Sequence, residues 1–362
     1  MIISIYSTQV IDTRPDLDRY GGLELVMGLL TKYIDEETEH TVYLFATENS
    51  YVPKKADSYL FSVGKAGTDP IMALKEFWRD ERSRKALMES DICLDASWGY
   101  YLYAPGIYEK LKNVAKSWHG PDPGWKEPPK HVKKPNLIAV GFNIAKYLSE
   151  VTGYEWRAVH NGIDLSRYKY NPKPISEREY LVWLSRLYPP KGAHEAIRIA
   201  NKLEIPIHIV GGSFGDPGNY VNLIKKMCEE SKYATFHGEV SHEKKVELLR
   251  NAKAVILPII EKNITSNGRT YIWREPMGIV GIEANACGTP FIVRPSYGWT
   301  ETLIHGYNGF HANSIEEFKY YIERVDEIKP ENCRRIAEHF NYKRMAKEYL
   351  KLFEEILAGR KW

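Results

Sequence analysis

Two glutamates flank a segment that has the residues of a helix start. Glu275 and Glu283 enclose Gly278 in the run Glu275-Pro-Met-Gly-Ile-Val-Gly-Ile-Glu283. A proline followed by a glycine is typical of a tight turn into a helix, and Gly288 and Pro290 mark its end. The first turn of a helix has free backbone N–H groups and a partial positive charge. We therefore expect this helix start to suit a phosphate.

Both carboxylates could serve groups attached to such a phosphate. Glu283 follows Gly278 at about 7.5 Å along a helix axis, and its side chain leans back toward the helix start. It can therefore reach a hydroxylated group, such as a ribose beside a diphosphate. Glu275 precedes the helix and can face a sugar hydroxyl on the other side of the phosphate. The alternative is two surface glutamates, one of them a favourable charge near a helix start.

A second motif supplies cations. The run Tyr180-Leu-Val-Trp-Leu-Ser-Arg186-Leu-Tyr-Pro-Pro-Lys191-Gly192 predicts a buried strand that ends in an arginine, a rigid turn, and a lysine that opens a helix. Ligands of parallel sheets bind beyond the carboxyl ends of the strands, and two cations suit a diphosphate. Either cation alone is more typical of a solvated surface. Together with the helix at Gly278, Arg186 and Lys191 favour a diphosphate site.

The elements that would position these residues alternate along the chain. Short, continuous apolar runs are typical of parallel strands that are buried on both faces. Helical stretches separate them, so we predict an α/β chain, doubly wound twice over. The predicted strands are Ile2–Tyr6, Thr41–Phe45, Ile92–Asp95, Val114–Trp118, Leu137–Val140, Leu181–Leu184, Ile207–Val210, Ala254–Ile259 and Phe291–Val293. The predicted helices include Gly22–Tyr33, Met72–Met88, His194–Lys202, Tyr220–Glu230 and Lys244–Ala252.

The length of 362 residues predicts about two domains. Residues 167–176 contain two prolines and no apolar periodicity, which indicates a linker. We place the two domains at residues 1–168 and 175–340. After residue 340, the apolar positions of Met345–Leu357 predict an amphipathic helix. Two irregular segments, 119–135 and 261–274, are candidates for binding loops.

The composition excludes several classes of protein. A net charge of +3 argues against a protein built to bind nucleic acid. No apolar run approaches the ~20 residues that span a bilayer, and the start of the chain lacks the features of a signal peptide. Cys93, Cys228, Cys287 and Cys333 have neither zinc nor disulfide spacing, so we expect a cytoplasmic protein. Gln9 is the only glutamine, which favours a hot environment over ordinary lineage bias.

Arg186, the pair Lys191-Gly192 and the two glutamates resemble glycosyltransferase family 4, whose members are retaining enzymes of the GT-B fold. The resemblance covers almost the whole chain. It implies two Rossmann-like domains that face each other across a cleft, the first for an acceptor and the second for a nucleotide-sugar. It also implies that the last helix, within 341–362, returns to the first domain. The family resemblance also includes four weaker motifs, which are Tyr20-Gly21-Gly22-Leu-Glu24, Asn161-Gly162-Ile-Asp164, Val210-Gly211-Gly212 and Gly306-Tyr-Asn-Gly309-Phe.

The resemblance implies a role for each matching residue. Arg186 and Lys191 would hold the donor diphosphate, and the amides at the helix start would take the distal phosphate. Glu283 would bind the ribose, and Glu275 hydroxyls of the donor sugar. Gly21 and Gly22 would let the opposing loop approach the phosphates closely. The full donor-binding set is Gly21, Gly22, Gly211, Gly212, Met277, Gly278, Ile279, Val280 and Glu283.

His119 completes the expected catalytic set with Arg186, Lys191 and Glu275. It follows the strand that ends at Trp118, where the family commonly places a histidine near the transferred sugar; the alternative is a structural hydrogen-bonding role. The family mechanism retains the anomeric configuration by front-face attack, in which the leaving phosphate helps to deprotonate the acceptor. The sequence offers no obvious acid/base carboxylate pair of the hydrolase kind to face the sugar. We expect a UDP-, GDP- or ADP-sugar donor and no cofactor.

Some features depart from the family or point elsewhere. Met277 replaces the usual aromatic residue, and the 261–274 insertion is long, which leaves the donor sugar and access to the acceptor open. Asp16-Leu-Asp18 matches the carboxylate pair of metal-dependent glycosyltransferases but lies in a polar loop, so we expect no essential metal. Alternatives on the same architecture are a nucleotide-sugar epimerase, a phosphorylase and a non-catalytic nucleotide-sugar-binding protein. The arginine, the lysine and the paired glutamates match a transferase better than an epimerase, and a non-catalytic protein has no need of them. No lysine motif for pyridoxal phosphate is apparent, which argues against a phosphorylase.

Two surface features bear on the acceptor, for which a glycan, a lipid-linked compound and another hydroxyl compound all stay open. A basic run could contact an anionic membrane at its inner face, or form a solvated loop. An aromatic cluster could stack on an acceptor sugar, or cover the core. The basic run is Trp125, Lys126, Lys130, Lys133 and Lys134, and the aromatic cluster is Trp98, Tyr100, Tyr101 and Tyr103.

Overall fold

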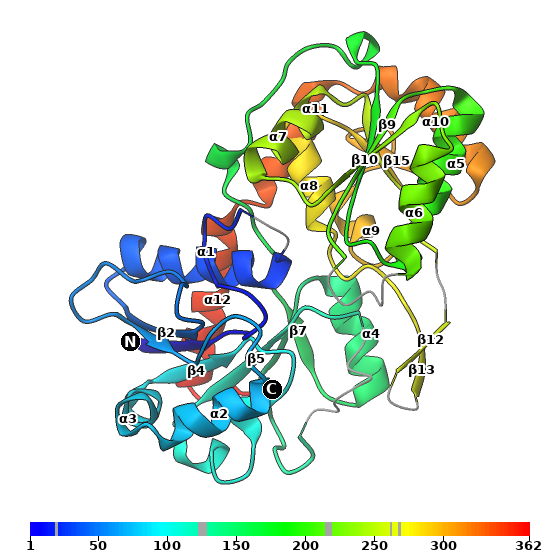
Figure 1. The fold of residues 1–362 in the computed structure, drawn as a ribbon. Coiled ribbons are helices and arrows are strands. Elements are labelled where there is room, and N and C mark those ends of the chain that lie inside the picture. Colours follow the sequence, from blue (N-terminus) through cyan, green and yellow to red (C-terminus); the bar gives the residue numbers. More distant parts are fainter. Residues whose placement is uncertain (19–20, 122–128, 214–218, 261–262, 267–268) are drawn as a thin grey trace. The chain divides into compact units, whose positions relative to one another are not determined.

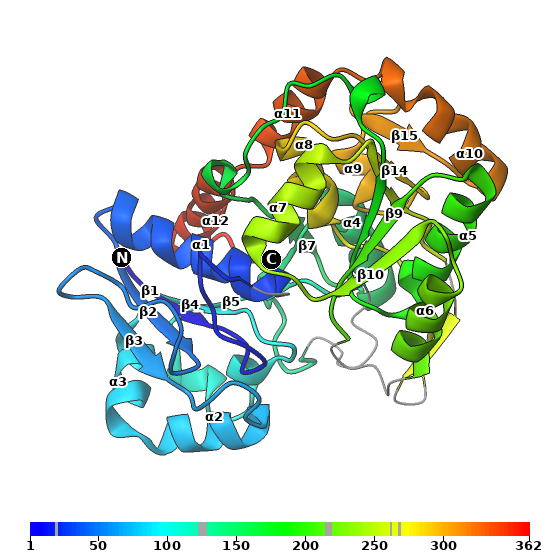
Figure 2. The same cartoon turned by 45° about the horizontal axis from the view of Figure 1, so that its top comes forward.

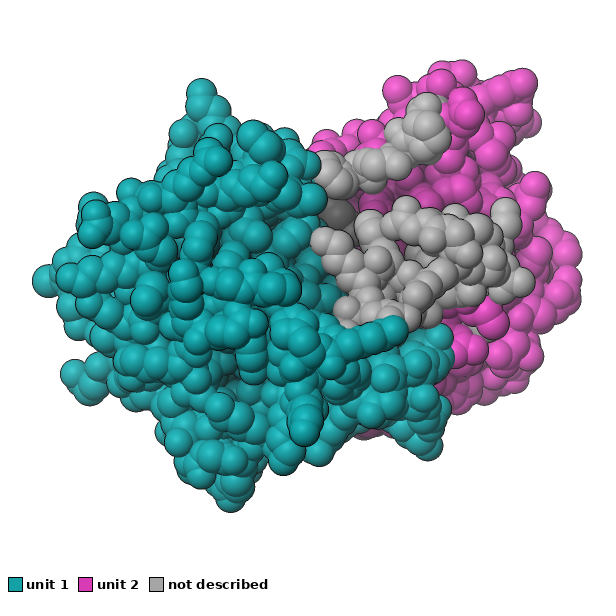
Figure 3. Space-filling model, turned by 90° about the horizontal axis from the view of Figure 1, so that it is seen from below, with its two compact units in different colours: residues 1–17, 21–162, 342–362 teal, residues 18–20, 163–341 magenta. Residues whose placement is uncertain are grey.

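The computed structural model describes the chain except for residues 19–20, 122–128, 214–218, 261–262 and 267–268, and it describes 263–266 and 269–271 by their backbone alone. The described chain forms two compact units, which Figure 3 colours separately. Unit 1 comprises residues 1–17, 21–162 and 342–362, and unit 2 comprises Asp18 and residues 163–341. The chain thus leaves unit 1 after Gly162 and returns to it at Tyr342.

Unit 1 is built on a parallel sheet with the strand order β3-β2-β1-β4-β5-β6-β7. Helices cover both of its faces, with α1 and α12 over one and α2 and α3 over the other (Figures 1 and 2). The strands are β1 Ile2–Tyr6, β2 Thr41–Ala46, β3 Tyr59–Ser62, β4 Ile92–Asp95, β5 Val114–Trp118, β6 Leu137–Ala139 and β7 Trp156–Ala158. The helices are α1 Gly22–Glu37, α2 Pro70–Arg79, α3 Glu81–Glu89, α4 Phe142–Thr152 and α12 Tyr342–Leu357.

Unit 2 has a second parallel sheet, with the order β10-β9-β8-β11-β14-β15. Its strands are β8 Leu181–Leu184, β9 Ile207–Val210, β10 Ala234–Gly238, β11 Ala254–Leu257, β14 Phe291–Val293 and β15 Gly309–His311. Its helices are α5 Ala193–Leu203, α6 Asn219–Glu229, α7 His242–Asn251, α8 Ile279–Ala286, α9 Trp299–Thr302, α10 Ile315–Arg324 and α11 Pro330–His339. The predicted fold class, α/β and doubly wound in both halves, is confirmed.

The central strands are buried along their whole length. Every residue of β4, β5 and β11 is buried. Parallel strands covered on both faces are expected to consist of apolar residues, and those of β11 do. Strand β5 departs from this pattern because it also carries Lys116, which is fully buried. Within the described residues, we find no helix with the length and apolar character of a membrane span.

The helix that we predicted over 72–88 is interrupted. Asp80 ends α2 and begins α3, and its carboxylate accepts a hydrogen bond from the backbone N–H of Ser83 at 2.7 Å. An aspartate at this position stabilises a new helix start, because it satisfies an otherwise unpaired N–H group. The apolar periodicity continues across the break, so periodicity alone predicted one helix where the chain forms two.

The segment 261–274, predicted to be irregular, contains a two-stranded antiparallel hairpin. Its strands are β12 Asn263–Ser266 and β13 Arg269–Ile272, with Asn263 opposite Ile272. Residues 261–262 and 267–268 lie outside the described part of the chain. The hairpin directly precedes Trp273, Arg274 and Glu275, so it leads into the segment of the expected site.

Residues 163–178 pack on unit 2. The guanidinium of Arg178 donates to the carbonyl oxygens of Asn171 and Lys173, at 2.9 and 2.8 Å, and to the hydroxyl of Thr289 at 2.9 Å. A buried guanidinium requires such partners because its desolvation is costly. The segment expected as a linker, 167–176, is thereby bound within unit 2.

Candidate functional site

The expected cations and glycines of unit 2 lie at the carboxyl ends of neighbouring strands. Arg186 follows β8, and Gly211 and Gly212 follow β9, which pairs with β8 in parallel. The backbone N–H of Leu187 donates to the carbonyl of Gly212 at 2.8 Å, which joins the two loops. Lys191 ends the turn Pro189–Lys191 that leads to α5. Such an edge is where α/β sheets bind their ligands.

A buried ion pair connects two parts of the expected site that are far apart in the sequence. The Nζ of Lys191 lies 2.5 Å from Oε2 of Glu275, and the two side chains are only 12% and 11% exposed. The same ammonium lies 4.5 Å from the centre of the Trp273 ring. Burial lowers the pKa of Lys191, Glu275 opposes that change, and nearby Arg186 adds to it. Lys191 and Glu275 therefore form one electrostatic unit with Arg186 beside it.

Arg186 has an unused hydrogen-bond donor. Its guanidinium lies over the ring of Tyr188, 4.7 Å from the ring centre. Its Nε is buried and has no hydrogen-bond partner in the described part of the chain. A buried donor without a partner carries a desolvation cost that an anionic ligand would offset. Arg186 thus has a donor that could form a hydrogen bond with an anionic ligand.

Helix α8 begins where the sequence predicts, and tight packing fixes its start. Gly278 has a left-handed backbone with φ of 76°, and a Cβ there would lie 2.1 Å from the ring of Trp299. The first hydrogen bond of this turn runs from the N–H of Gly281 to the carbonyl of Gly278. The amides of Ile279 and Val280 precede it and belong to the unsatisfied donors of the first turn. Met277, the residue before Gly278, is buried.

Glu283 is held by two residues that the sequence did not suggest. Its carboxylate accepts hydrogen bonds from the hydroxyl of Tyr168 at 2.5 Å and from the Nζ of Lys245 at 2.6 Å. Burial alone raises the pKa of Glu283, but Lys245 and both hydrogen bonds outweigh it and lower that pKa. Tyr168 comes from the expected linker and Lys245 from α7. No local pattern links either of them to Glu283.

Gly211 is required by the packing of the strand ends. Its φ is 155°, and a Cβ would lie 1.7 Å from the carbonyl oxygen of Ser185. At Gly212, a Cβ would lie 3.1 Å from the carboxylate of Glu239. At Gly211, the ends of the two strands thus approach each other too closely to leave room for a side chain. The donor-binding role of Gly211 and Gly212 stays a prediction.

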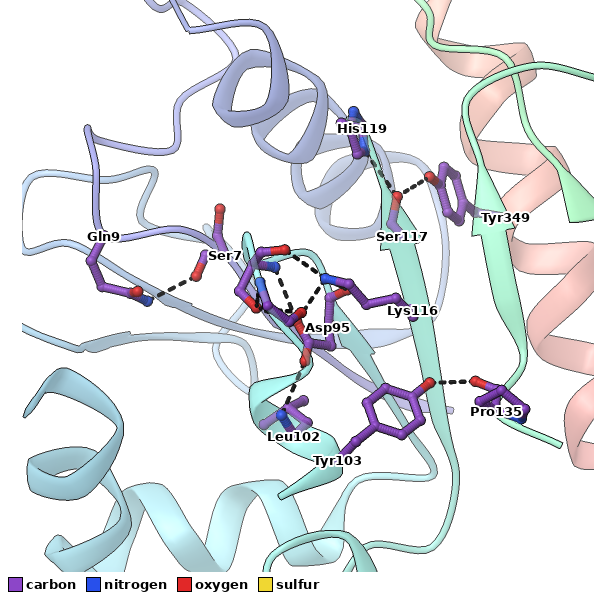
Figure 4. Close-up of polar contacts among 12 residues, drawn as sticks. Ser7, Gln9, Asp95, Leu102, Tyr103, Lys116, Ser117, His119, Pro135 and Tyr349 are labelled. Carbon is purple, nitrogen blue, oxygen red and sulfur yellow. Dashed lines mark hydrogen bonds and ion pairs between the residues drawn. The ribbon is translucent and has the colours of Figure 1, made fainter. Parts of the chain in front are cut away.

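His119, Gly21 and Gly22 belong to unit 1, and the other expected site residues belong to unit 2. Gly21 precedes α1 and Gly22 is its first residue, and a Cβ on Gly21 would lie 2.2 Å from Ile11. Tyr20, which starts this motif, lies outside the described residues. His119 follows β5 and is half-buried. Its Nε2 lies 2.9 Å from the Oγ of Ser117 (Figure 4).

A buried lysine shapes the surroundings of His119. The Nζ of Lys116 lies 3.1 Å from a carboxylate oxygen of Asp95 (Figure 4). It also lies 2.5 Å from the carbonyl oxygen of Ser97. Burial, and in addition the charge of Lys116, lower the pKa of His119 to about 3. The imidazole is therefore neutral at neutral pH.

The aromatic cluster divides between core and surface. The Tyr100 ring stacks on Trp118, with ring centres 6.0 Å apart, and the buried Tyr103 stacks on Tyr108. Tyr100 and Tyr103 thus cover the core, while Trp98 is 37% exposed.

The two aspartates that match a metal-binding carboxylate pair, Asp16 and Asp18, have protein partners. Asp16 pairs with Arg14 at 2.9 Å, and Asp18 accepts a hydrogen bond from the backbone N–H of His242. Among the described residues, no group of three or more potential ligands is arranged for a metal ion.

Of the basic run, Trp125 and Lys126 lie outside the described part, and Lys130, Lys133 and Lys134 are exposed.

Comparisons with known proteins bear on both units. Residues 168–340 match the sequence model of the family described as Glycosyl transferases group 1. A probable sucrose-phosphate synthase of Thermosipho melanesiensis is 28% identical over 200 residues, which are 53% of this chain and 44% of that protein. The chain thus aligns with less than half of this relative's length.

Two further proteins match over more of their length. A GDP-mannose-dependent alpha-(1-6)-phosphatidylinositol monomannoside mannosyltransferase of Mycobacterium tuberculosis is 25% identical over 327 residues, 80% of this chain and 81% of that protein. The solved structure of a sucrose-phosphate synthase from Thermosynechococcus elongatus matches with a TM-score of 0.77 at 17% identity. It covers 99% of this chain and 100% of that one. The expected GT-B fold is confirmed by this likeness.

Replacing Lys245 tests how Glu283 is held. In Lys245→Met, Glu283 loses its ammonium partner inside the protein, so we expect the free energy of unfolding at neutral pH to fall by about 1–3 kcal/mol. Because the folded-state pKa of Glu283 is lowered, its stabilisation is present above the ordinary value of 4.5 and is lost as the pH falls through the lower folded value. Denaturant unfolding across this range should show the two proteins converging in acid.

Lys244→Met is the matched control, because Lys244 is a neighbouring lysine whose ion pair with Glu247 is exposed. We expect it to change stability by less than about 1 kcal/mol. Equal losses in both variants, or a loss in Lys245→Met that is independent of pH, would show that the contact with Glu283 contributes nothing particular.

Proposed function

We propose that this chain, whose residues 168–340 match the family model of Glycosyl transferases group 1, is a retaining glycosyltransferase. It would move a sugar from a nucleoside diphosphate sugar to a hydroxyl acceptor. The observation that carries this proposal is the buried pair of Lys191 and Glu275, beside Arg186 at one edge of the second sheet. No observation favours the alternatives of an epimerase, a phosphorylase or a non-catalytic binding protein.

The diphosphate is assigned to the cationic side of this site. Lys191 and Arg186 would meet its charge, and the unsatisfied amides of Ile279 and Val280 would bind the distal phosphate. In the absence of a ligand Glu275 neutralises the Lys191 ammonium. An arriving diphosphate would share that ammonium, which would free a carboxylate oxygen of Glu275 for hydroxyls of the donor sugar.

The ribose is assigned to Glu283. Tyr168 and Lys245 hold one of its oxygens, Oε1, at 2.5 and 2.6 Å. The other oxygen keeps its capacity to accept hydrogen bonds from ribose hydroxyls. Lys245 and Tyr168 are thus positioning residues for nucleotide binding in this proposal. The nucleobase, whether of a UDP-, GDP- or ADP-sugar, is open.

The chemical step follows from where negative charge develops. When the sugar–phosphate bond breaks, charge collects on the leaving diphosphate, where Arg186, Lys191 and the start of α8 would stabilise it. The leaving phosphate oxygen would take the acceptor proton on the same face of the sugar, so the anomeric configuration is kept. Because protein cations meet the leaving group's charge, we propose that turnover needs no metal.

The acceptor is assigned to unit 1, with His119 as the residue that contacts the transferred sugar. One relative is named for transfer to a phosphatidylinositol monomannoside and another for sucrose-phosphate synthesis. We therefore leave a glycan, a lipid-linked compound or another hydroxyl compound as the acceptor class. The four cysteines are buried free thiols, which agrees with the cytoplasmic location that we propose.

Replacing Lys191 tests the donor site. In Lys191→Met, loss of a charge-assisted hydrogen bond should weaken binding of the best of the UDP-, GDP- and ADP-sugars by about 10- to 100-fold, measured by calorimetry. The rate of slow donor hydrolysis should also be lower than that of the wild type, both in Lys191→Met and in Glu275→Ala.

Wild-type turnover should be unchanged in EDTA, and the transferred sugar should keep the donor's anomeric configuration in the NMR spectrum of the product.

Lys202→Met, an exposed substitution on α5, is the matched control and should bind the donor as the wild type does. Unaltered donor binding in Lys191→Met would refute the site assignment but leave the fold intact. If no nucleotide-sugar binds the wild-type protein, the proposed function is wrong.

The exposed lysines Lys130, Lys133 and Lys134 motivate a proposal of peripheral membrane contact. Each lysine near an anionic surface contributes about 1 kcal/mol, so replacing all three by serine should strongly reduce binding to phosphatidylserine vesicles. Co-sedimentation measures this, with neutral vesicles as the control. Wild-type protein that stays in the supernatant with anionic vesicles would refute the contact.

Stability at high temperature is proposed from the single glutamine and from exposed ion pairs between successive helix turns. Examples are Lys85 with Glu89, Lys226 with Glu230, and Arg344 with Glu348. Such pairs gain weight as temperature rises, since charged groups become easier to desolvate. We expect a thermal midpoint above the range of about 45–65 °C that is common in mesophile domains. A calorimetric midpoint within that range would contradict the proposal.

A further inference from the structure

A chain of hydrogen bonds connects His119 to the last helix within unit 1. The Nε2 of His119 lies 2.9 Å from the Oγ of Ser117, and the same Oγ lies 2.7 Å from the hydroxyl of Tyr349 on α12 (Figure 4). Ser117 and Tyr349 are 1% and 0% exposed, so water does not supply other partners freely. Each hydroxyl has one proton to donate. The protons of this chain can therefore be assigned by counting.

Only one arrangement uses both hydroxyl protons. If Tyr349 donates to Ser117, then Ser117 donates to Nε2 of His119, and both buried hydroxyl protons have an acceptor. In the reverse arrangement Nε2–H donates to Ser117 and Ser117 donates to Tyr349. The Tyr349 proton then has no acceptor in the described part of the chain. A buried donor without a partner is costly enough to favour the first arrangement by about 5- to 150-fold.

We infer that Ser117 and Tyr349 hold His119 as the tautomer with its proton on Nδ1, so that His119 acts as a hydrogen-bond donor and not as a base. Nε2 is then occupied as an acceptor, and Nδ1 has no hydrogen-bond partner among the described residues. Tyr349 is a positioning residue that acts through Ser117. Only the identity of the group that Nδ1–H meets, a sugar or acceptor oxygen, rests on the proposed function.

Burial and a nearby positive charge disfavour the remaining state of His119, the imidazolium. Lys116, the strand neighbour of Ser117, is fully buried with its ammonium 5.6 Å from the centre of the Trp118 ring. Asp95 balances this ammonium from β4 at 3.1 Å. Burial makes a charged imidazole unfavourable, and the positive charge of Lys116 adds to that cost, so the pKa of His119 is lowered. On α12, Glu348 is the charged group that interacts electrostatically with the Tyr349 hydroxyl.

An Nδ1–H donor fits a particular task in transfer. A neutral imidazole that donates can hold a sugar hydroxyl oxygen, or an oxygen on which negative charge develops, throughout the reaction. It cannot take a proton from the acceptor, because Nδ1 already has one and Nε2 is engaged. This assigns deprotonation of the acceptor to another group, in agreement with a role for the leaving phosphate.

The test is nitrogen-15 NMR of the full-length protein with labelled histidine, in which the two ring nitrogens report the tautomer directly. The His119→Asn variant identifies the signal. We expect the wild type to show protonated Nδ1 and unprotonated Nε2 from neutral pH down to about pH 5. Signals of the Nε2–H tautomer, or of the imidazolium at neutral pH, would overturn the inference.

Variants test the link to α12. In Ser117→Ala, neither ring nitrogen is held, so both tautomers should appear; a signal that stays wholly on Nδ1 would show that another contact fixes it. The double variant Ser117→Ala with Tyr349→Phe removes both buried hydroxyls. It should show the same mixture even if the single variant folds poorly. The matched control is Tyr103→Phe, which removes another buried hydroxyl that bonds the carbonyl of Pro135 and should leave the tautomer unchanged.

Activity supplies a separate readout. If His119 contacts the reacting sugar, the double variant should lower kcat by about two- to tenfold with little change in the donor KM, because the lost bias acts in the transition state. An altered tautomer without a change in kcat would refute the role in transfer while the tautomer assignment stands. An inactive wild-type protein would refute the proposed function alone.

Discussion

Two opposite charges, the ammonium of Lys191 and the carboxylate of Glu275, share a buried position at the end of the second sheet. Burying a charge pair stabilises a protein little or not at all, since the lost hydration is as large as the attraction gained. The pair is therefore poorly explained by stability. The proposed donor site gives the pair a role, in which Glu275 neutralises the Lys191 ammonium until an anionic ligand binds.

Neighbouring residues of unit 2 fix the positions of these two charges. The two prolines before Lys191 make its turn rigid, and Ser296 fixes Glu275 by accepting a hydrogen bond from its N–H at 2.9 Å. Gly278 lets α8 begin directly against Trp299, so the helix start lies immediately after Glu275. Close contacts, such as that of Gly278 with the Trp299 ring, thus fix where the charged groups lie at this edge of the sheet.

Sequence reasoning predicted the parts of this arrangement that are local. The continuous apolar runs predicted the parallel strands, and the residues around Gly278 predicted the start of α8. It failed where a side chain overrides periodicity, as Asp80 does between α2 and α3. It also missed contacts between distant segments, such as Tyr168 and Lys245 on Glu283, or Tyr349 on Ser117. Such partners have no spacing rule, because tertiary packing alone brings them together.

The central claim is that Lys191 and the start of α8 bind the diphosphate of the donor. A crystal structure of the complex with a nucleoside diphosphate tests it most directly. We predict that the distal phosphate contacts the amides of Ile279 and Val280, with the Nζ of Lys191 on a phosphate oxygen and Glu283 on the ribose. A diphosphate bound elsewhere, with Lys191 still paired only to Glu275, would contradict the account.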